Sequence, residues 1–184
     1  MEISKDAFST SQILSKIWLA EELEKIKTSN PLRILCFGGW YGITNFILRT
    51  RDKLNIELFR NLELDKEACA AADNINKAWE WQDWQFKSIY GDCNKFEYTS
   101  NDYNTVINTS SEHMKSTEWF ERIPKGTLTI IQSNNMPHEE HCHNHKTVDE
   151  MTKDFPLGGL LFSGEKEFVY PEWSFKRFMM IGVK

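Results

Sequence analysis

Short apolar runs alternate with amphipathic stretches along this chain, at intervals typical of strands that alternate with helices. Five apolar runs predict strands: Leu32–Phe37, 55–64, a run ending at Tyr90, 103–108 and 127–131. Helical periodicity or a helix-favouring composition is found in four stretches: 12–26, Ile43–Arg51, 66–79 and 147–155. The alternation predicts an α/β fold with a mostly parallel sheet.

The end of the chain departs from this alternation. Residues 157–168 predict a sixth strand and residues 175–183 a seventh. The link between them turns at Pro171 and is too short for a helical crossover, so it fits a hairpin. We therefore expect the last strand to run antiparallel to its neighbour.

A glycine-bearing turn, Gly38-Gly39-Trp40-Tyr41-Gly42, joins the first predicted strand to the helix Ile43–Arg51. Glycine suits a backbone that must adopt positive φ or approach a ligand closely. Asp65 follows the second strand, 23 residues after Gly42, a separation that suits a carboxylate binding a ribose. Strand, glycine turn, helix and acid together are typical of a nucleotide-binding α/β half.

The glycine spacing helps to choose between nucleotide cofactors. A dinucleotide fingerprint, Gly-x-Gly-x-x-Gly, requires glycine where this chain has Trp40 or Tyr41, and their bulk would obstruct a pyrophosphate. S-adenosylmethionine carries no phosphate and needs only backbone room at Gly38 and Gly42. The turn therefore favours S-adenosylmethionine over NAD.

From about residue 33 onward, the chain resembles a class I S-adenosylmethionine-dependent methyltransferase. The first motif of that family, acid-x-Gly-x-Gly-x-Gly, lies over residues 36–42, where Cys36 replaces the acid and Trp40 the middle glycine. Two segments resemble the family's adenine-contacting segment and its turn into a fifth strand: Tyr90-Gly91-Asp92-Cys93 and Ile123-Pro124-Lys125-Gly126. The runs Asn-Thr-Ser-x-Glu-His-Met and Gln-Ser-Asn-Asn are also similar to those of small methyltransferase-like proteins of phages and bacteria.

The resemblance implies one methyltransferase-like domain over residues 1–184. Residues 1–30 form a helical segment in it, which either lids the cofactor site or only covers the sheet. The implied sheet is Rossmann-like and mostly parallel, in the order 3-2-1-4-5-7-6, with an antiparallel last strand and helices on both faces. The cofactor-binding residues that it implies are Gly38, Gly39, Trp40, Gly42, Asp65, Asp92, Cys93 and Asn108.

The missing acid at Cys36 leaves open how the methionine end of a cofactor is held, because a neutral thiol cannot form a charge-assisted hydrogen bond. Trp40 has two interpretations. It forms an aromatic wall against the ligand, or it fills a gap beside the N-terminal segment. A relative with reduced or absent cofactor affinity therefore stays an alternative.

Methyl transfer from a sulfonium needs an oriented nucleophile and, for a hydroxyl or amine, a base. Suitable groups follow the fourth predicted strand, in Asn108-Thr109-Ser110-Ser111-Glu112-His113-Met114. We expect His113 to act as the base, Glu112 to orient the substrate and Asn108 to form hydrogen bonds near the transferring methyl group. In the alternative interpretation, a serine of this segment caps the next helix and Glu112 stabilises its first turn.

A second polar segment, Gln132-Ser133-Asn134-Asn135-Met136-Pro137, follows the fifth predicted strand. It leads into a histidine-rich run, residues 138–145, which contains four histidines, a cysteine and two acids. These are residue types that bind metals, but their spacing matches no common zinc finger and Cys142 interrupts a His-Glu-x-x-His motif. We expect a polar substrate-facing loop without a metal, in which His141 is a second candidate base.

Composition narrows the class of protein. A chain of 184 residues leaves little room for a second domain beside such a core. The net charge of -5 argues against a broad nucleic-acid surface, so we expect a small-molecule substrate. The sequence shows no signal-peptide or membrane-span pattern. Its four widely spaced cysteines suit reduced thiols, so we expect a cytoplasmic location. The cysteines are Cys36, Cys69, Cys93 and Cys142.

These observations predict an enzyme that uses S-adenosylmethionine to methylate an oxygen or nitrogen of a small or medium polar acceptor. Alternatives stay open. One is a protein of the same fold that binds without turnover, and another is aminopropyl transfer from a decarboxylated cofactor, which the missing acid makes worth testing. A nicotinamide-dependent oxidoreductase is disfavoured by the broken dinucleotide fingerprint.

Overall fold

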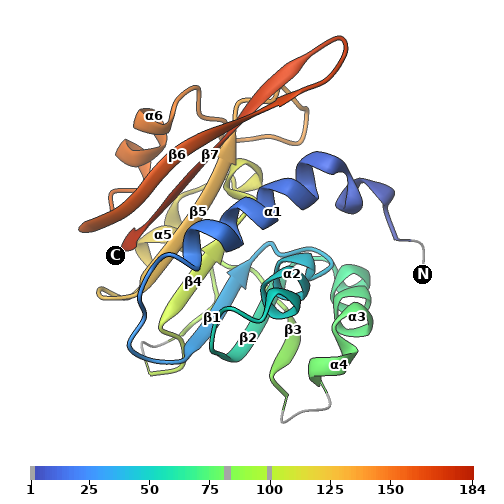
Figure 1. Cartoon of the computed structure of the whole chain (residues 1–184), viewed down its shortest axis with the longest axis vertical. Helices are drawn as coiled ribbons and strands as arrows, with labels where there is room; N and C mark the ends of the chain where they lie inside the picture. Colours follow the sequence, from blue (N-terminus) through green and yellow to red (C-terminus); the bar gives the residue numbers. More distant parts are fainter. Residues whose placement is uncertain (1–2, 81–83, 99–100) are drawn as a thin grey trace.

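Seven strands form one sheet in the computed structural model, which describes residues 3–80, 84–98 and 101–184. The strands are β1 (Leu32–Phe37), β2 (Ile56–Glu63), β3 (Phe86–Tyr90), β4 (Thr105–Asn108), β5 (Leu128–Asn134), β6 (Gly159–Val169) and β7 (Ser174–Val183). Their order across the sheet is β3-β2-β1-β4-β5-β7-β6, which confirms the predicted order (Figure 1).

The pairing is parallel from β3 through β5, and β7 lies antiparallel between β5 and β6. β1 pairs with β2 on one side and with β4 on the other, so the direction of winding reverses at β1. In such a sheet, the loops that leave the two strands at the reversal separate and form a crevice beyond their carboxyl ends.

Helices cover both faces of the sheet, as predicted. The helices are α1 (Thr10–Leu23), α2 (Ile43–Arg51), α3 (Lys66–Ile75), α4 (Lys77–Glu80), α5 (Glu118–Glu121) and α6 (Val148–Asp154), with short 3-10 turns η1 (Lys5–Phe8) and η2 (Ser111–His113). In Figure 1, α1 crosses the near side of the sheet from the N-terminal end of the chain.

Two apolar cores form because successive side chains of a strand point to opposite faces. On β1, Ile34 and Cys36 face the core beneath α1, α2 and α3, whereas Leu35 and Phe37 face the core that contains α5 and α6. All four side chains of β1 named here are fully buried. A strand buried on both faces reads as a continuous apolar run, which is why this strand was visible in the sequence.

Helix and strand ends differ from the predictions by a few residues. The predicted helix 12–26 is α1, which begins at Thr10 and ends at Leu23. The predicted helix 66–79 divides into α3 and α4 because the buried Asn76 turns its side chain inward to bond Gly42 O and Asn45. Among the described residues, no helix is long and apolar enough to cross a membrane.

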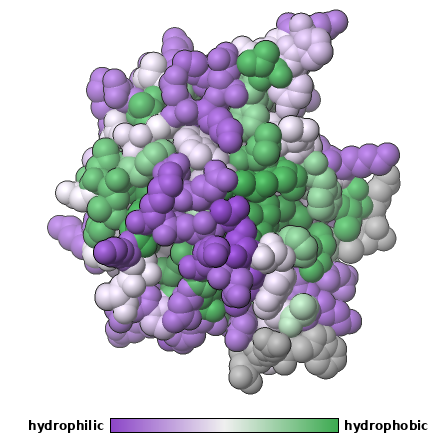
Figure 2. Space-filling view, viewed as in Figure 1, coloured by the Kyte–Doolittle hydropathy of each residue, from purple (hydrophilic) through white to green (hydrophobic). Residues whose placement is uncertain are grey.

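The surface mixes polar and apolar side chains. Figure 2 shows hydrophilic side chains gathered near the centre of the face that α1 crosses, with hydrophobic side chains on either side of them. Exposed apolar side chains are scattered singly on most folded proteins, so this pattern by itself points to no partner.

Candidate active site

A cavity of about 510 Å³ opens at the carboxyl ends of the central strands, where the winding of the sheet reverses. The loops after β1, β2 and β3 line one end of it, through Gly38, Gly39, Trp40, Glu63, Leu64, Asp65, Gly91 and Cys93. The other end is lined from α1, η2, β7 and the segment after β5, including Lys16, Ser110, Glu112, His113, Asn134, His141 and Arg177. The volume lies within the range of small-molecule sites.

At Gly38 and Gly39, the turn after β1 places backbone, and no side chain, at the wall of the cavity. Gly38 has φ +56, and a Cβ on it would lie 3.1 Å from Met114 Cε. The space beside Gly39 is smaller, since a Cβ there would lie 1.9 Å from Asn61 Oδ1. Gly42 has φ +68 and packs against Asn76, away from the cavity lining. Gly42 therefore serves the shape of the turn and does not face a ligand.

Trp40 occupies the position of the missing glycine with φ +48. Its ring stacks on Tyr41 at 4.7 Å between centroids, and the residue both packs against the core beneath α1 and lines the cavity. The crevice is not closed by Trp40, since the cavity continues past it to Gly38 and Gly39.

Two acids lie near the end of β2, and they have different contacts. Glu63 Oε2 accepts a hydrogen bond from Trp40 N at 2.9 Å, so this carboxylate faces the glycine turn. Asp65 is the N-cap of α3, where Oδ1 accepts from Glu67 N and Ala68 N. Both acids line the cavity, and strand β2 ends at Glu63, one residue earlier than predicted.

Of the other residues expected to bind the cofactor, one lines the cavity and two only shape the loops around it. Cys93 lines the cavity and its Sγ lies 3.7 Å from Met114 Sδ. Asp92 instead accepts from Asn94 N, and Asn108 is fully buried with its Oδ1 bonded to Ser110 N. Neither Asp92 nor Asn108 lines the cavity, so both shape the loops that carry the lining residues.

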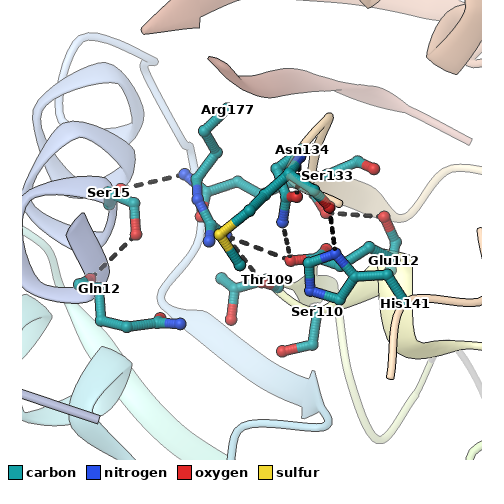
Figure 3. A network of polar contacts seen from close by, with 12 residues as sticks. Gln12, Ser15, Thr109, Ser110, Glu112, Ser133, Asn134, His141 and Arg177 are labelled. Carbon is teal, nitrogen blue, oxygen red and sulfur yellow. Dashed lines mark hydrogen bonds and ion pairs between the residues drawn. The ribbon is translucent and has the colours of Figure 1, made fainter. Parts of the chain in front are cut away.

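Glu112 is the most enclosed acid of the site, with 2% of its surface exposed. Its Oε1 accepts a hydrogen bond from Asn134 Nδ2 and lies 3.6 Å from Arg177 Nη1. Its backbone oxygen accepts from the amides of Cys142 and His143, which fastens the histidine-rich loop to η2. Figure 3 shows Glu112, Asn134 and Arg177 turned toward one another beside His141.

The structure brings together the two histidines that the sequence proposed as bases. The rings of His113 and His141 are 4.7 Å apart and nearly perpendicular, and both residues line the cavity. His141 Nδ1 lies 2.8 Å from Met136 O, and since a carbonyl can only accept, this nitrogen carries the proton. Burial lowers the pKa of His141.

Two buried cations of the site were missed by the sequence analysis. Lys16 lies on α1, and burial, reinforced by Arg177, lowers its pKa to about 7. Arg177 lies on β7 with 3% of its surface exposed and donates to Thr109 O. The available signal was a charged residue within an apolar stripe: Lys16 follows the helical stripe of α1, and Arg177 interrupts the last apolar run.

The histidine-rich run contributes to a second cluster outside the cavity lining. His143 Nε2 and His145 Nε2 lie 2.8 Å and 3.2 Å from the same oxygen, Asp154 Oδ2. The remaining nitrogen of His145 bonds Ser133 Oγ at 2.7 Å. His143, His145 and Asp154 thus satisfy one another and join the loop to α6.

Solved structures share this fold. One is magnesium protoporphyrin IX methyltransferase from Synechocystis PCC 6803 with bound SAM, at TM-score 0.67 over 99% of this chain and 86% of that chain, with 11% sequence identity. Another is N-methyltransferase NodS from Bradyrhizobium japonicum WM9, at TM-score 0.65 over 99% of this chain and 100% of that chain, with 10% identity. A third is the YcgJ protein from Bacillus subtilis, at TM-score 0.68 over 93% of this chain and 98% of that chain, with 10% identity.

The chain therefore has the fold of class I S-adenosylmethionine-dependent methyltransferases, as its motifs and their order predicted. No family model matches the chain, and no curated protein matches it by sequence.

Proposed function

We propose that this protein binds S-adenosylmethionine and transfers its methyl group to an oxygen or nitrogen of a small or medium polar acceptor. The observation that carries the proposal is one continuous cavity, which joins the glycine turn and Glu63 at one end to Glu112, His113 and His141 at the other. Solved structures of the same fold include methyltransferases with bound SAM and SAH.

The cofactor end suits an adenosyl group without phosphates. The bare backbone at Gly38 and Gly39 leaves the room that a Cβ would fill. Glu63 Oε1 accepts from the amides of Leu64 and Asp65, whereas Oε2 accepts from Trp40 N and has a lone pair left for a ribose hydroxyl. Leu64, with 63% of its surface exposed and its side chain at the cavity, offers an apolar surface for a base. Glu63 replaces Asp65 as the proposed ribose ligand.

Arg177 and the protonated form of Lys16 suit the methionine end, because buried cations bind a carboxylate through charge-assisted hydrogen bonds. Lys16 lies near Cys36, where the family resemblance would place an acid, and Arg177 lies 3.6 Å from Glu112. The same cations favour a cofactor that keeps its carboxylate, which argues against the decarboxylated cofactor of an aminopropyl transferase.

The bound cofactor supplies a methyl group already activated by the sulfonium. The chain must then orient an acceptor and remove its proton. The unprotonated Nε2 of His141 can accept a proton from an acceptor hydroxyl or amine, and His113 lies beside it at the exposed rim. Glu112 and Asn134 are placed to hold polar groups of the acceptor.

Calorimetry tests the cofactor. The native chain should bind S-adenosylmethionine and S-adenosylhomocysteine, and Glu63→Gln should weaken both about 10- to 100-fold, the effect of losing a hydrogen bond to a charged group. Asp65→Ala is the matched control: it should keep most of the affinity but lose about 1 kcal/mol of stability with its helix cap. Absence of binding to the native chain would refute the cofactor assignment, and loss in Asp65→Ala alone would restore Asp65 as the ligand.

A binding protein without turnover is the second candidate, and the replacements at Cys36 and Trp40 favour it. The two candidates differ in one assay. Production of S-adenosylhomocysteine in the presence of hydroxyl- or amine-bearing acceptors supports the enzyme. Tight cofactor binding with no product across such acceptors supports the binding protein.

A further inference from the structure

We infer that Glu112, His113 and His141 form a binding site for a divalent transition metal at the acceptor end of the cavity. Metal binding is a property of the three side chains alone, whereas the use of the ion in methyl transfer rests on the proposed function. The ligand atoms of the three residues all lie within 4.8 Å of one another, although they come from η2 and from the loop after β5.

The carboxylate of Glu112 carries the argument. Its Oε1 is bonded to Asn134 and lies near Arg177, but its Oε2 is buried and has no hydrogen-bond partner among the described residues. An unpaired oxygen of a buried carboxylate is costly, because it has lost water and gained nothing in return. A cation seated between this oxygen and the two imidazoles would remove that cost.

His141 is prepared for coordination. Its Nδ1–H donates to Met136 O, which fixes the tautomer and ring orientation and leaves the lone pair of Nε2 available. A ligand histidine in metal sites commonly donates its other ring hydrogen to a backbone carbonyl or carboxylate in this way. His113 is exposed, and its ring has no hydrogen-bond partner among the described residues, so it can turn toward an ion.

The loop that carries His141 is already fastened to Glu112. The amides of Cys142 and His143 both donate to the backbone oxygen of Glu112, at 2.8 Å and 3.0 Å. With metal–nitrogen bonds of about 2.0–2.1 Å, ligand atoms lie roughly 3.0–3.4 Å apart, so the cluster needs only a small inward movement of the side chains. Rotation of the exposed His113 supplies it.

The side chains of the second histidine cluster, His143, His145 and Asp154, differ because they already bond one another. His143 and His145 both bond Asp154 Oδ2, and His145 also bonds Ser133, so three of the four ring nitrogens of this cluster already have partners. These side chains fasten the loop to α6 and provide a control of the same composition, two histidines and a carboxylate, close to the proposed site.

Two imidazoles and one carboxylate suit zinc, manganese or iron(II), and leave coordination positions open. An acceptor hydroxyl bound there would lose its proton to solvent at the cavity mouth more readily. Its oxygen would then form a bond to the methyl carbon as the carbon–sulfur bond breaks and its electron pair returns to sulfur. The ion would take over the activation assigned above to the two histidines, and it favours an acceptor that presents oxygen.

Metal titration of the chelator-treated protein, without cofactor, tests the site. Zn²⁺ and Mn²⁺ are titrated by calorimetry, and Co²⁺ is followed by its visible absorption, which reports its coordination. We expect one ion per chain, and affinity lowered at least about 10-fold in Glu112→Gln, His113→Ala and His141→Ala. His113→Ala is the variant least able to disturb folding because its side chain is exposed.

His143→Ala and Asp154→Asn serve as matched controls and should keep the native metal affinity. Loss of binding in these two variants but not in the first three would move the ion to the second cluster and overturn the inference. Failure of the native chain to bind any of the three ions would also overturn it. Either result leaves the cofactor experiment on Glu63 unaffected, so the two proposals fail separately.

Discussion

Gly39 and Lys16 show how closely single residues of the cavity are constrained by their neighbours. The side chain of Asn61 lies against Gly39, where it donates to Trp40 O at 3.1 Å and to Ser88 Oγ at 3.4 Å. Lys16, a buried residue of α1, donates from its Nζ to Gln12 Oε1 at 2.7 Å. The first constraint is steric and the second electrostatic, and each leads to a measurable effect.

Gly39→Ala should destabilise the fold. The added methyl group would lie 1.9 Å from Asn61 Oδ1, so the amide must move and give up its bond to Trp40. We expect the free energy of unfolding to fall by about 1–3 kcal/mol, as for other overpacked sites. Denaturant unfolding measures it, with Gly158→Ala as control, since a Cβ there meets only Val183 O at 3.7 Å. Equal losses in the two variants would contradict the steric argument.

Lys16 should make stability rise with pH just above neutrality. Its pKa is about 7 in the folded protein and 10.5 in the unfolded chain, so between these values only the unfolded chain keeps the proton. Raising the pH from 7 to 8.5 then favours the folded state, by on the order of 1 kcal/mol per pH unit. The charged and titratable groups that act on Lys16 are Arg177, Cys36, Glu112 and Asp6.

The measurement is urea unfolding at several pH values, compared with Lys16→Met. Subtracting the two curves removes the contributions of the histidines and thiols that both proteins share. The rise should be absent from the Lys16→Met protein. The window ends near pH 8.5 because burial raises the pKa of Cys36 to about 12, so thiol ionisation favours the unfolded chain at higher pH. An unchanged slope in the variant would show that Lys16 stays charged when buried.

At the scale of helices and strands, the alternation of apolar runs was sufficient to predict the strands, but the end of a helix depended on distant residues. α3 ends beside Asn76, whose side chain bonds Asn45 and Gly42, 31 and 34 residues earlier in the chain. The helix propensity of residues 66–79 depends on those residues alone, so it could not predict a helix end that is set by distant partners. At the end of β2, the hydrogen bond from Trp40 N to Glu63 joins two loops that are distant in the sequence, and this contact is why we propose Glu63 as the ribose ligand in place of Asp65.

Asn76→Ala should weaken the junction between α3, α4 and the glycine turn. The substitution leaves Gly42 O and the amide of Asn45 without their buried partner. We expect a loss of about 2–3 kcal/mol in the free energy of unfolding. Asn74→Ala, at an exposed position of the same helix, should change it by no more than about 0.5 kcal/mol. Thermal or denaturant unfolding of both variants checks the difference. Similar losses of unfolding free energy in the two variants would show that the buried hydrogen bonds of Asn76 do not determine the stability of this junction.

At the scale of the whole molecule, the sequence predicted the sheet order but only part of the site. The order followed from motifs that occur in sequence in the same succession as in the family. Glu112, His113 and His141 were named because their loops follow β4 and β5 and so meet at one edge of a parallel sheet. Lys16 and Arg177 reach the same place from α1 and β7. A charge within an apolar stripe marks each of them in the sequence, but nothing there shows that such distant segments meet.

The position of β7 has a consequence for biosynthesis. This strand follows the other strands of the sheet in the sequence, yet it lies inside the sheet, between β5 and β6, and β6 has no other described strand beside it. Until β7 emerges, the nascent chain has an open sheet edge at β5 and lacks the guanidinium that faces Glu112. A chain that lacked β7 would therefore be prone to aggregation and would lack a cation of the proposed site, so the sheet and the proposed site are completed together.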